Sequence, residues 1–114
     1  MPQKNESNEH IPLTEAIYYI LLALHQSMHG YAIIQYVKEI SRDRVQLGPG
    51  TLYGAIKSMV EKGWIEPIEN DSDSRRKEYK ITELGKTVVR SELGRLEELV
   101  INGQKIIRGD SNDN

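Results

Sequence analysis

Three consecutive cations end a polar turn, and a fourth lies on a short helical segment that precedes the turn. The cations Arg75, Arg76 and Lys77 follow residues 70–74, which are Asn, Asp and Ser, the residue types that favour turns. Lys57 lies in the segment 49–62, where apolar residues recur at helical spacing. Ammonium and guanidinium groups bind phosphate, and the planar fork of arginine bonds bidentately. These residues indicate a surface that contacts a polyanion.

The predicted helix 49–62 has an apolar face and a polar face. The apolar face holds Leu52, Ile56, Met59 and Val60, and the polar face holds Thr51, Tyr53, Gly54, Lys57 and Ser58. In a major groove, Lys57 would reach a base edge or a phosphate, and Tyr53 a phosphate or a thymine methyl group. Thr51 would bond a phosphate near the helix start, and Gly54 would permit close approach. The alternative interpretation places Tyr53 in the core and leaves Lys57 solvated.

The cations at 75–77 have two interpretations as well. They either contact the phosphate backbone and an adjacent minor groove, or they belong to a solvated loop in which arginine pairs with Asp71 or Asp73. Exposed pairs of that kind contribute only about 0–1 kcal/mol. Tyr31, at the start of another predicted helix, either reaches a phosphate or lies in the core with its hydroxyl in water.

Composition excludes several kinds of site. The chain of 114 residues has no Cys, which excludes disulfides, thiolate nucleophiles and cysteine-based zinc sites. His10, His25 and His29 do not have metal-binding spacing, and no Walker lysine or nucleophile-elbow serine is present. We therefore expect no catalytic residue, no metal and no cofactor, and a protein that is not an enzyme.

Charge and hydropathy set the remaining limits. The formal net charge is -2, which argues mildly against binding to nucleic acid. At physiological salt, however, DNA is affected only by charges within about 8–10 Å, so what matters is whether the cations share one face. No apolar run approaches the roughly 20 residues that span a bilayer, and residues 1–10 lack an apolar signal core. We therefore expect a cytoplasmic protein.

The predicted elements are helix, helix, short strand, helix, strand, turn, strand and long helix. Thr14 is expected to cap the first helix, Pro49 to begin the third and Gly63 to end it. Residues 25–30 are predicted as a break, 31–40 as the second helix and 44–47 as the short strand. Strands are predicted at 64–69 and 77–82, before a helix at 83–108. This order predicts an α+β, mainly α fold: a winged helix-turn-helix with an added long C-terminal helix.

The last predicted helix has a heptad pattern. Its apolar positions follow 4-3-4-3-4 spacing, at Val89, Leu93, Leu96, Val100, Gly103 and Ile107. Such a stripe either packs on a twofold mate or on the chain's own winged helix. We expect a flexible arm at 1–12, a DNA-binding domain at 13–82, a dimerisation helix at 83–108 and a disordered tail at 109–114.

Four motifs in register give the chain a resemblance to the PadR family of bacterial transcriptional regulators. They are the segments 29–33 (HGYAI), 50–56 (GTLYGAI), 61–65 (EKGWI) and 75–82 (RRKEYKIT), followed by Leu84 and Gly85. The resemblance covers residues 13–108, and the single C-terminal helix is similar to the smaller, LmrR-like subfamily. In multidrug-sensing members, a Trp on the dimerisation helix stacks on flat aromatic drugs, and Leu93 or a close neighbour takes that place here.

The resemblance implies a homodimeric winged-helix repressor that binds a palindrome near its own promoter. A small aromatic or phenolic effector between protomers would alter how the dimer binds DNA. Residues that would line its pocket are Tyr18, Tyr19, Leu93 and Leu96. The alternative function is a winged-helix module that docks proteins and does not bind DNA, which the mild net acidity favours.

Overall fold

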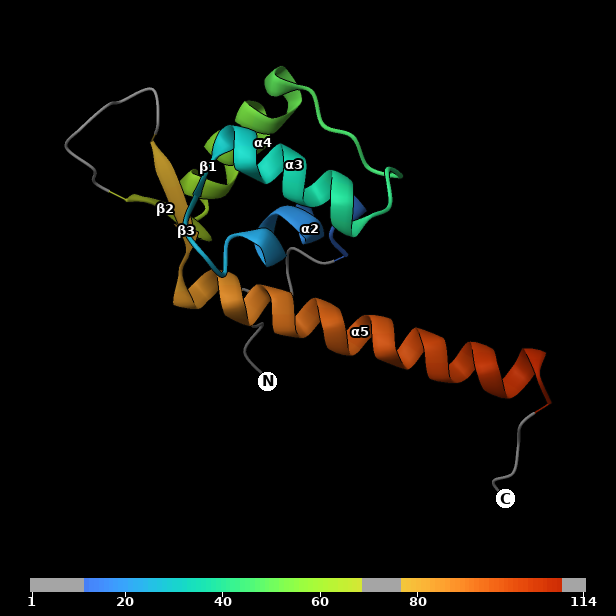
Figure 1. Ribbon diagram of the computed structural model, residues 1–114. Helices are drawn as coiled ribbons and strands as arrows, with labels where there is room; N and C mark the ends of the chain where they lie inside the picture. Colours follow the sequence, from blue (N-terminus) through green and yellow to red (C-terminus); the bar gives the residue numbers. More distant parts are fainter. Residues whose placement is uncertain (1–11, 69–76, 110–114) are drawn as a thin grey trace, which may run out of the picture.

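The computed structural model describes residues 12–68 and 77–109 of the chain. Its elements are α2 (Glu15–Ala23), β1 (Met28–His29), α3 (Gly30–Ile40), α4 (Pro49–Glu61), β2 (Ile65–Ile68), β3 (Glu78–Ile81) and α5 (Glu83–Ile107). The shorter helices and the sheet gather over the first half of α5, and the second half of α5 continues beyond them (Figure 1). The predicted α+β, mainly α winged helix-turn-helix is therefore confirmed, while the expected arm and tail lie almost wholly outside the described residues.

Local signals fix the helix ends as predicted. The Thr14 side chain accepts a hydrogen bond from the backbone N–H of Ile17 and caps α2. Pro49 occupies the first turn of α4. Gly63, at φ +79°, follows the last turn of α4, and the Trp64 N–H donates to the Met59 carbonyl at 2.9 Å. This is a Schellman ending, in which glycine takes the left-handed position.

The sheet corrects one predicted strand and adds another. Its order is β1-β3-β2, all antiparallel, so residues 28–29 form a strand where a break was predicted. Residues 44–47 are not a strand. They follow two residues with positive φ, Arg42 and Asp43, and the Val45 N–H donates to the Ser41 hydroxyl at 2.9 Å. The alternation in 44–47 arises because Val45 and Leu47 pack on the core from a loop.

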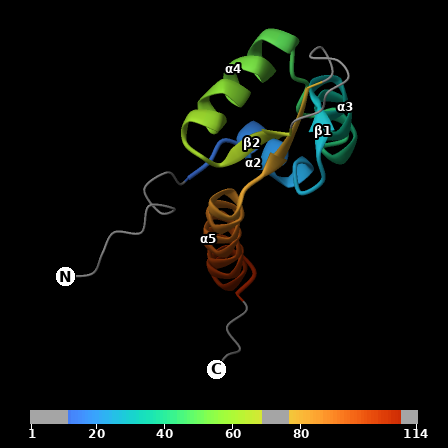
Figure 2. The same cartoon turned by 90° about the vertical axis from the view of Figure 1, so that its left-hand side faces the viewer.

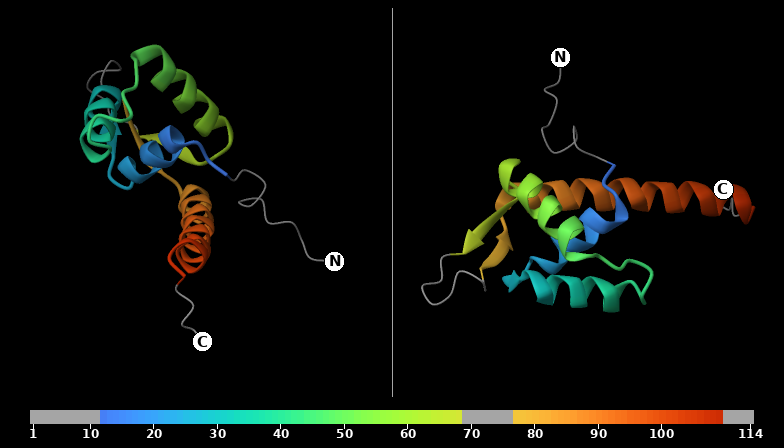
Figure 3. Two further views of the ribbon diagram at one scale, coloured as in Figure 1. Left: turned by 90° about the vertical axis from the view of Figure 1, so that its right-hand side faces the viewer. Right: turned by 90° about the horizontal axis from the view of Figure 1, so that it is seen from above.

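The first half of α5 belongs to the core. Its buried residues include Val88 and Val89, which belong to one core cluster with residues of α2, α3, α4, β2 and β3. Val89, which was predicted at the dimer interface, is only 6% exposed and lies in the core of its own chain. Every other element lies on one side of α5 when it is viewed end-on (Figure 3).

The apolar stripe of α5 continues past the point where its own domain stops covering it. The half of the helix beyond Glu92 exposes Leu93, Leu99, Val100, Ile106 and Ile107. The first half of the helix therefore packs on the chain's own winged helix, as one interpretation of the heptad pattern predicts, and the second half has apolar side chains in solvent.

Candidate nucleic-acid interface

Helix α4 separates a buried face from an exposed face, as its sequence predicts. Leu52, Ile56 and Met59 are buried in the core. The outward residues Thr51, Tyr53, Gly54 and Lys57 are exposed. The N-cap residue Gly48 offers no side-chain hydrogen bond, so the first backbone N–H groups of α4 point into solvent without a capping side chain. An uncapped helix start beside the Thr51 hydroxyl is suited to an anionic oxygen.

Tyr53 lies across the start of α3. A Cβ atom built on Gly30 would lie 2.1 Å from the Tyr53 hydroxyl oxygen and 2.7 Å from its Cζ. Gly30 is buried, whereas Tyr53 keeps 49% of its surface exposed. The Tyr53 ring therefore joins α4 to α3 with one edge and offers the remainder to solvent, which combines parts of the two interpretations of this residue.

The sheet register brings the other predicted residues to the same place. β1 and β3 pair His29 with Glu78, so Tyr31 follows one strand and Lys77 precedes the other at the same end of this pair. Tyr31 is 67% exposed, and Lys77 is exposed. Figure 2 looks onto this end of the molecule, with α4 to the left of the strands, α3 to the right and α5 below. Arg75, Arg76 and their turn lie outside the described residues.

The hydroxyl of Tyr79 lies in the same region, on β3. Burial raises the pKa of Tyr79, and the neighbouring Tyr53 raises this pKa further. Tyr79 pairs with Met28 on one side and with Pro67 on the other. The middle strand thus places an aromatic ring near Tyr53, the residue through which α4 contacts α3.

Ser58 differs from its neighbours on the polar face of α4. It is half-buried, and its hydroxyl accepts a hydrogen bond from Lys62 Nζ at 3.0 Å. The same ammonium group lies 5.3 Å from the centre of the Trp64 ring. Ser58 is therefore engaged within the protein, and Lys62 stabilises the end of α4.

The residues predicted to line an effector pocket fall on two hollows that share Leu96. One, of about 340 Å³, is lined by Leu13, Glu15, Tyr18, Tyr19, Glu92, Arg95 and Leu96. The other, of about 420 Å³, is lined by Leu93, Leu96, Glu97, Val100 and Ile101 on α5 alone. The structure therefore brings Tyr18 and Tyr19 together with Leu96, and places Leu93 on the adjoining surface.

A buried carboxylate in the first hollow escaped the sequence analysis. Glu92 is 1% exposed; its oxygens accept two 2.8 Å hydrogen bonds from Arg95 and a 3.0 Å bond from the Leu13 N–H. The Arg95 hydrogen bonds, the Leu13 bond and the Arg95 charge lower the pKa of Glu92 against the opposing effect of burial. The only sequence signal was opposite charge at i and i+3. Burial, with Glu92 and Glu97 nearby, raises the pKa of Tyr18.

Residues 12–68 and 77–109 lack two other kinds of site. This part of the chain holds no group of three or more His, Asp or Glu side chains placed to bind a metal ion. None of its helices is both long enough and apolar enough to cross a membrane.

Comparison with known proteins supplies the family. Residues 19–91 match the transcriptional regulator PadR-like family. A PadR-like transcription factor from Bacteroides fragilis superposes with a TM-score of 0.65 at 28% identity, over 79% of this chain and 87% of that one. A transcriptional regulator from Clostridium thermocellum has a TM-score of 0.65 at 19% identity, over 86% of this chain and 93% of that one, and supports the fold alone.

Two further proteins are similar over different lengths. RosR from H. salinarum has a TM-score of 0.62 at 25% identity, over 81% of this chain and 94% of that one. An uncharacterised 37.1 kDa protein in transposon TN4556 of Streptomyces fradiae is 34% identical over 65 residues. That match covers 57% of this chain and only 18% of the transposon protein, so the chain spans less than a fifth of that relative.

Proposed function

Because the chain belongs to the PadR-like family of transcriptional regulators, which are not enzymes, we propose that it represses transcription by binding a palindromic operator as a homodimer. The observation that carries the proposal is the convergence of the exposed face of α4 with Tyr31 and Lys77 at one end of the molecule. In the dimer, α4 of each protomer is the recognition helix. The two recognition helices enter successive major grooves about 34–36 Å apart.

The local charge of the recognition helix supports this role despite the net charge of -2. Residues 49–60 include Lys57 and no Asp or Glu, and the only acid of α4 is Glu61 in its last turn. Lys57 would contact a base edge or a phosphate, while Thr51 and the uncapped N–H groups would bind a phosphate. Arg75, Arg76 and Lys77 would contact the flanking backbone or minor groove.

The exposed half of α5 supports dimerisation. Leu93, Leu96, Val100 and Ile107 continue the stripe that the first half buries, and burying apolar surface stabilises association by roughly 25 cal/mol per Å². In this proposal residues 13–82 bind DNA and residues 83–108 dimerise, with the first two turns of α5 also serving the core.

A small aromatic or phenolic effector would act through the hollow between α2 and α5. Tyr18, Tyr19 and Leu96 offer aromatic and apolar surface there, and Leu93 lies beside it toward the proposed partner. A ligand that binds one arrangement of the α5 helices more tightly would shift the dimer toward that arrangement and change its affinity for the operator.

Binding to duplex DNA is the test of the proposal. The protein is mixed with DNA from upstream of its own gene and with random duplex at low salt, and the shift of each is measured on gels. Tighter binding to the upstream DNA supports a sequence-specific regulator, and candidate aromatic compounds added to the same assay test for release. If the protein shifts neither duplex, the result favours the protein-docking alternative instead.

A further inference from the structure

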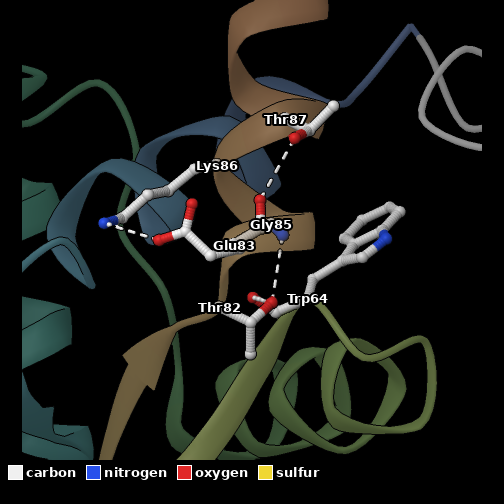
Figure 4. Close-up of polar contacts among 6 residues, drawn as sticks. All are labelled: Trp64, Thr82, Glu83, Gly85, Lys86 and Thr87. Atoms are coloured by element: carbon white, nitrogen blue, oxygen red, sulfur yellow. Dashed lines mark hydrogen bonds and ion pairs between the residues drawn. The ribbon is translucent and has the colours of Figure 1, made fainter.

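The end of the recognition helix and the start of α5 are bonded to one another around a single carbonyl group. The Trp64 carbonyl, just past the end of α4, accepts hydrogen bonds from the Thr82 N–H at 2.9 Å and the Thr82 hydroxyl at 3.0 Å. The same hydroxyl lies 2.6 Å from the Gly63 carbonyl oxygen and accepts from the Gly85 N–H at 3.0 Å, which caps α5. Figure 4 shows Thr82 between Trp64 and the first turn of α5.

Gly85 brings the two helices closer than any other residue would allow. A Cβ atom built on Gly85 would lie 2.2 Å from the Trp64 carbonyl oxygen and 2.7 Å from Ile81 Cγ1. Both the Trp64 carbonyl and the β3 backbone around Ile81 are held, since Ile81 N–H also donates to the Leu24 carbonyl at 2.8 Å. The Trp64 carbonyl belongs to the backbone and cannot move away as the end of a flexible side chain can.

These contacts connect the end of α4 to the start of α5 by hydrogen bonds. Trp64 donates to Met59 in the Schellman ending of α4 and accepts from Thr82, and Thr82 in turn accepts from the Gly85 N–H in the first turn of α5. This joint, defined here as Trp64, Thr82 and Gly85, connects the helix that would enter the groove to the helix that would hold the partner.

We propose that Thr82 and Gly85 are positioning residues that set the distance between the two recognition helices of the dimer, and so the spacing of the two half-sites in the operator. This inference rests on the proposed function. A side chain at position 85 must displace the start of α5 by about 1 Å, which over one turn of about 5.4 Å tilts the helix by roughly 10°. From Gly85 to Val100 the helix rises about 22 Å, so that tilt moves the dimer contact by about 4 Å. One base pair of B-DNA is about 3.4 Å.

Selection from a random duplex library tests the spacing directly, using the full chain. The unaltered protein should select two half-sites at one spacing. Gly85→Ala should select the same half-site sequence with a spacing changed by about one base pair, or with several spacings. Thr82→Val keeps the shape of the side chain and loses the hydroxyl hydrogen bonds, so it should select a broader range of half-site spacings. Thr82→Ser keeps the hydroxyl and should select the same single spacing as the unaltered protein. Gly94→Ala is the matched control on α5, because a Cβ there meets no atom within 4 Å.

The outcomes separate the two proposals. Loss of fold alone would weaken binding to sites of every spacing equally. Loss of the positioning role would instead change which spacing the protein prefers. If Gly85→Ala does not fold by circular dichroism, the Thr82→Val and Thr82→Ser pair decides the question. The inference is overturned if the folded variants select the unaltered spacing. Should the unaltered chain select no paired site, the proposed function itself is overturned.

Discussion

Among single residues, Lys57 is the exposed cation of the recognition helix on its outward face. Lys57→Ala should weaken operator binding several-fold and lower the slope of log affinity against log salt by about one per protomer, because one phosphate contact is lost. Gel shifts at two salt concentrations measure both effects. Lys105→Ala, an exposed cation near the end of α5, should leave both unchanged. Equal binding by Lys57→Ala and the unaltered chain at both salts would remove Lys57 from the interface.

The buried Glu92 gives the protein a pH-dependent stability. Because the pKa of Glu92 is lowered from its usual 4.5, the charged form stabilises the fold above that pH, and this contribution is lost as the pH falls through the lowered value. Glu92→Gln should therefore unfold at a lower temperature than the unaltered chain at pH 7, and the difference should shrink below pH 4.5. Thermal unfolding of both proteins across pH 3–7 checks this. A constant difference would show that the charge of Glu92 does not stabilise the fold.

Among the elements, α4 depends on glycine at one end. Gly63→Ala should lower the free energy of unfolding by about 1 kcal/mol, because φ at this position is +79° and a Cβ atom is strained there. Gly94→Ala should raise it by up to about 1 kcal/mol, since Gly94 lies within α5 with open space around it. Urea unfolding of the two variants compares them, and equal effects of the same sign would contradict the Schellman ending of α4.

The elements also show which parts of the fold the sequence could predict. Helix ends were predictable because Thr14, Pro49 and Gly63 act on the backbone within a few residues of themselves. β1 was not, because its two residues are too few for a period and form a strand only by pairing with Tyr79 and Glu78, far along the chain. The sequence of the loop 44–47 alternates because Val45 and Leu47 pack on the core, while a hydrogen bond to Ser41 shapes its backbone.

The candidate interface was predictable to a similar extent. The period of α4 in the sequence separates its outward residues from its core residues. The period could not show that Tyr53 rests on Gly30 or that Ser58 is bonded to Lys62, since both depend on side-chain packing. Glu92 escaped notice because a carboxylate on a charged helix gives no sign that an arginine and a backbone N–H enclose it.

At the scale of the whole molecule, the second half of α5 has more apolar surface than its own chain covers. Val100, 56% exposed and outside the core, lies in the middle of this surface. Val100→Glu should convert a dimer into a folded monomer at micromolar concentration, because it places a charge where apolar surfaces would meet. Sedimentation measures the mass. Asn102→Glu adds the same charge at a nearby exposed position and should remain a dimer. If the unaltered chain sediments as a monomer, the proposed dimer is contradicted.

The contact between Gly30 and Tyr53 has a consequence for how such proteins diverge. The tyrosine hydroxyl occupies the space that any side chain at position 30 would need. A side chain at position 30 therefore displaces the Tyr53 ring, and we expect relatives with alanine at the first position to favour a shorter residue at the second. Within this chain, Gly30→Ala should be rescued by truncating Tyr53, so that the double variant is more stable than the first substitution alone.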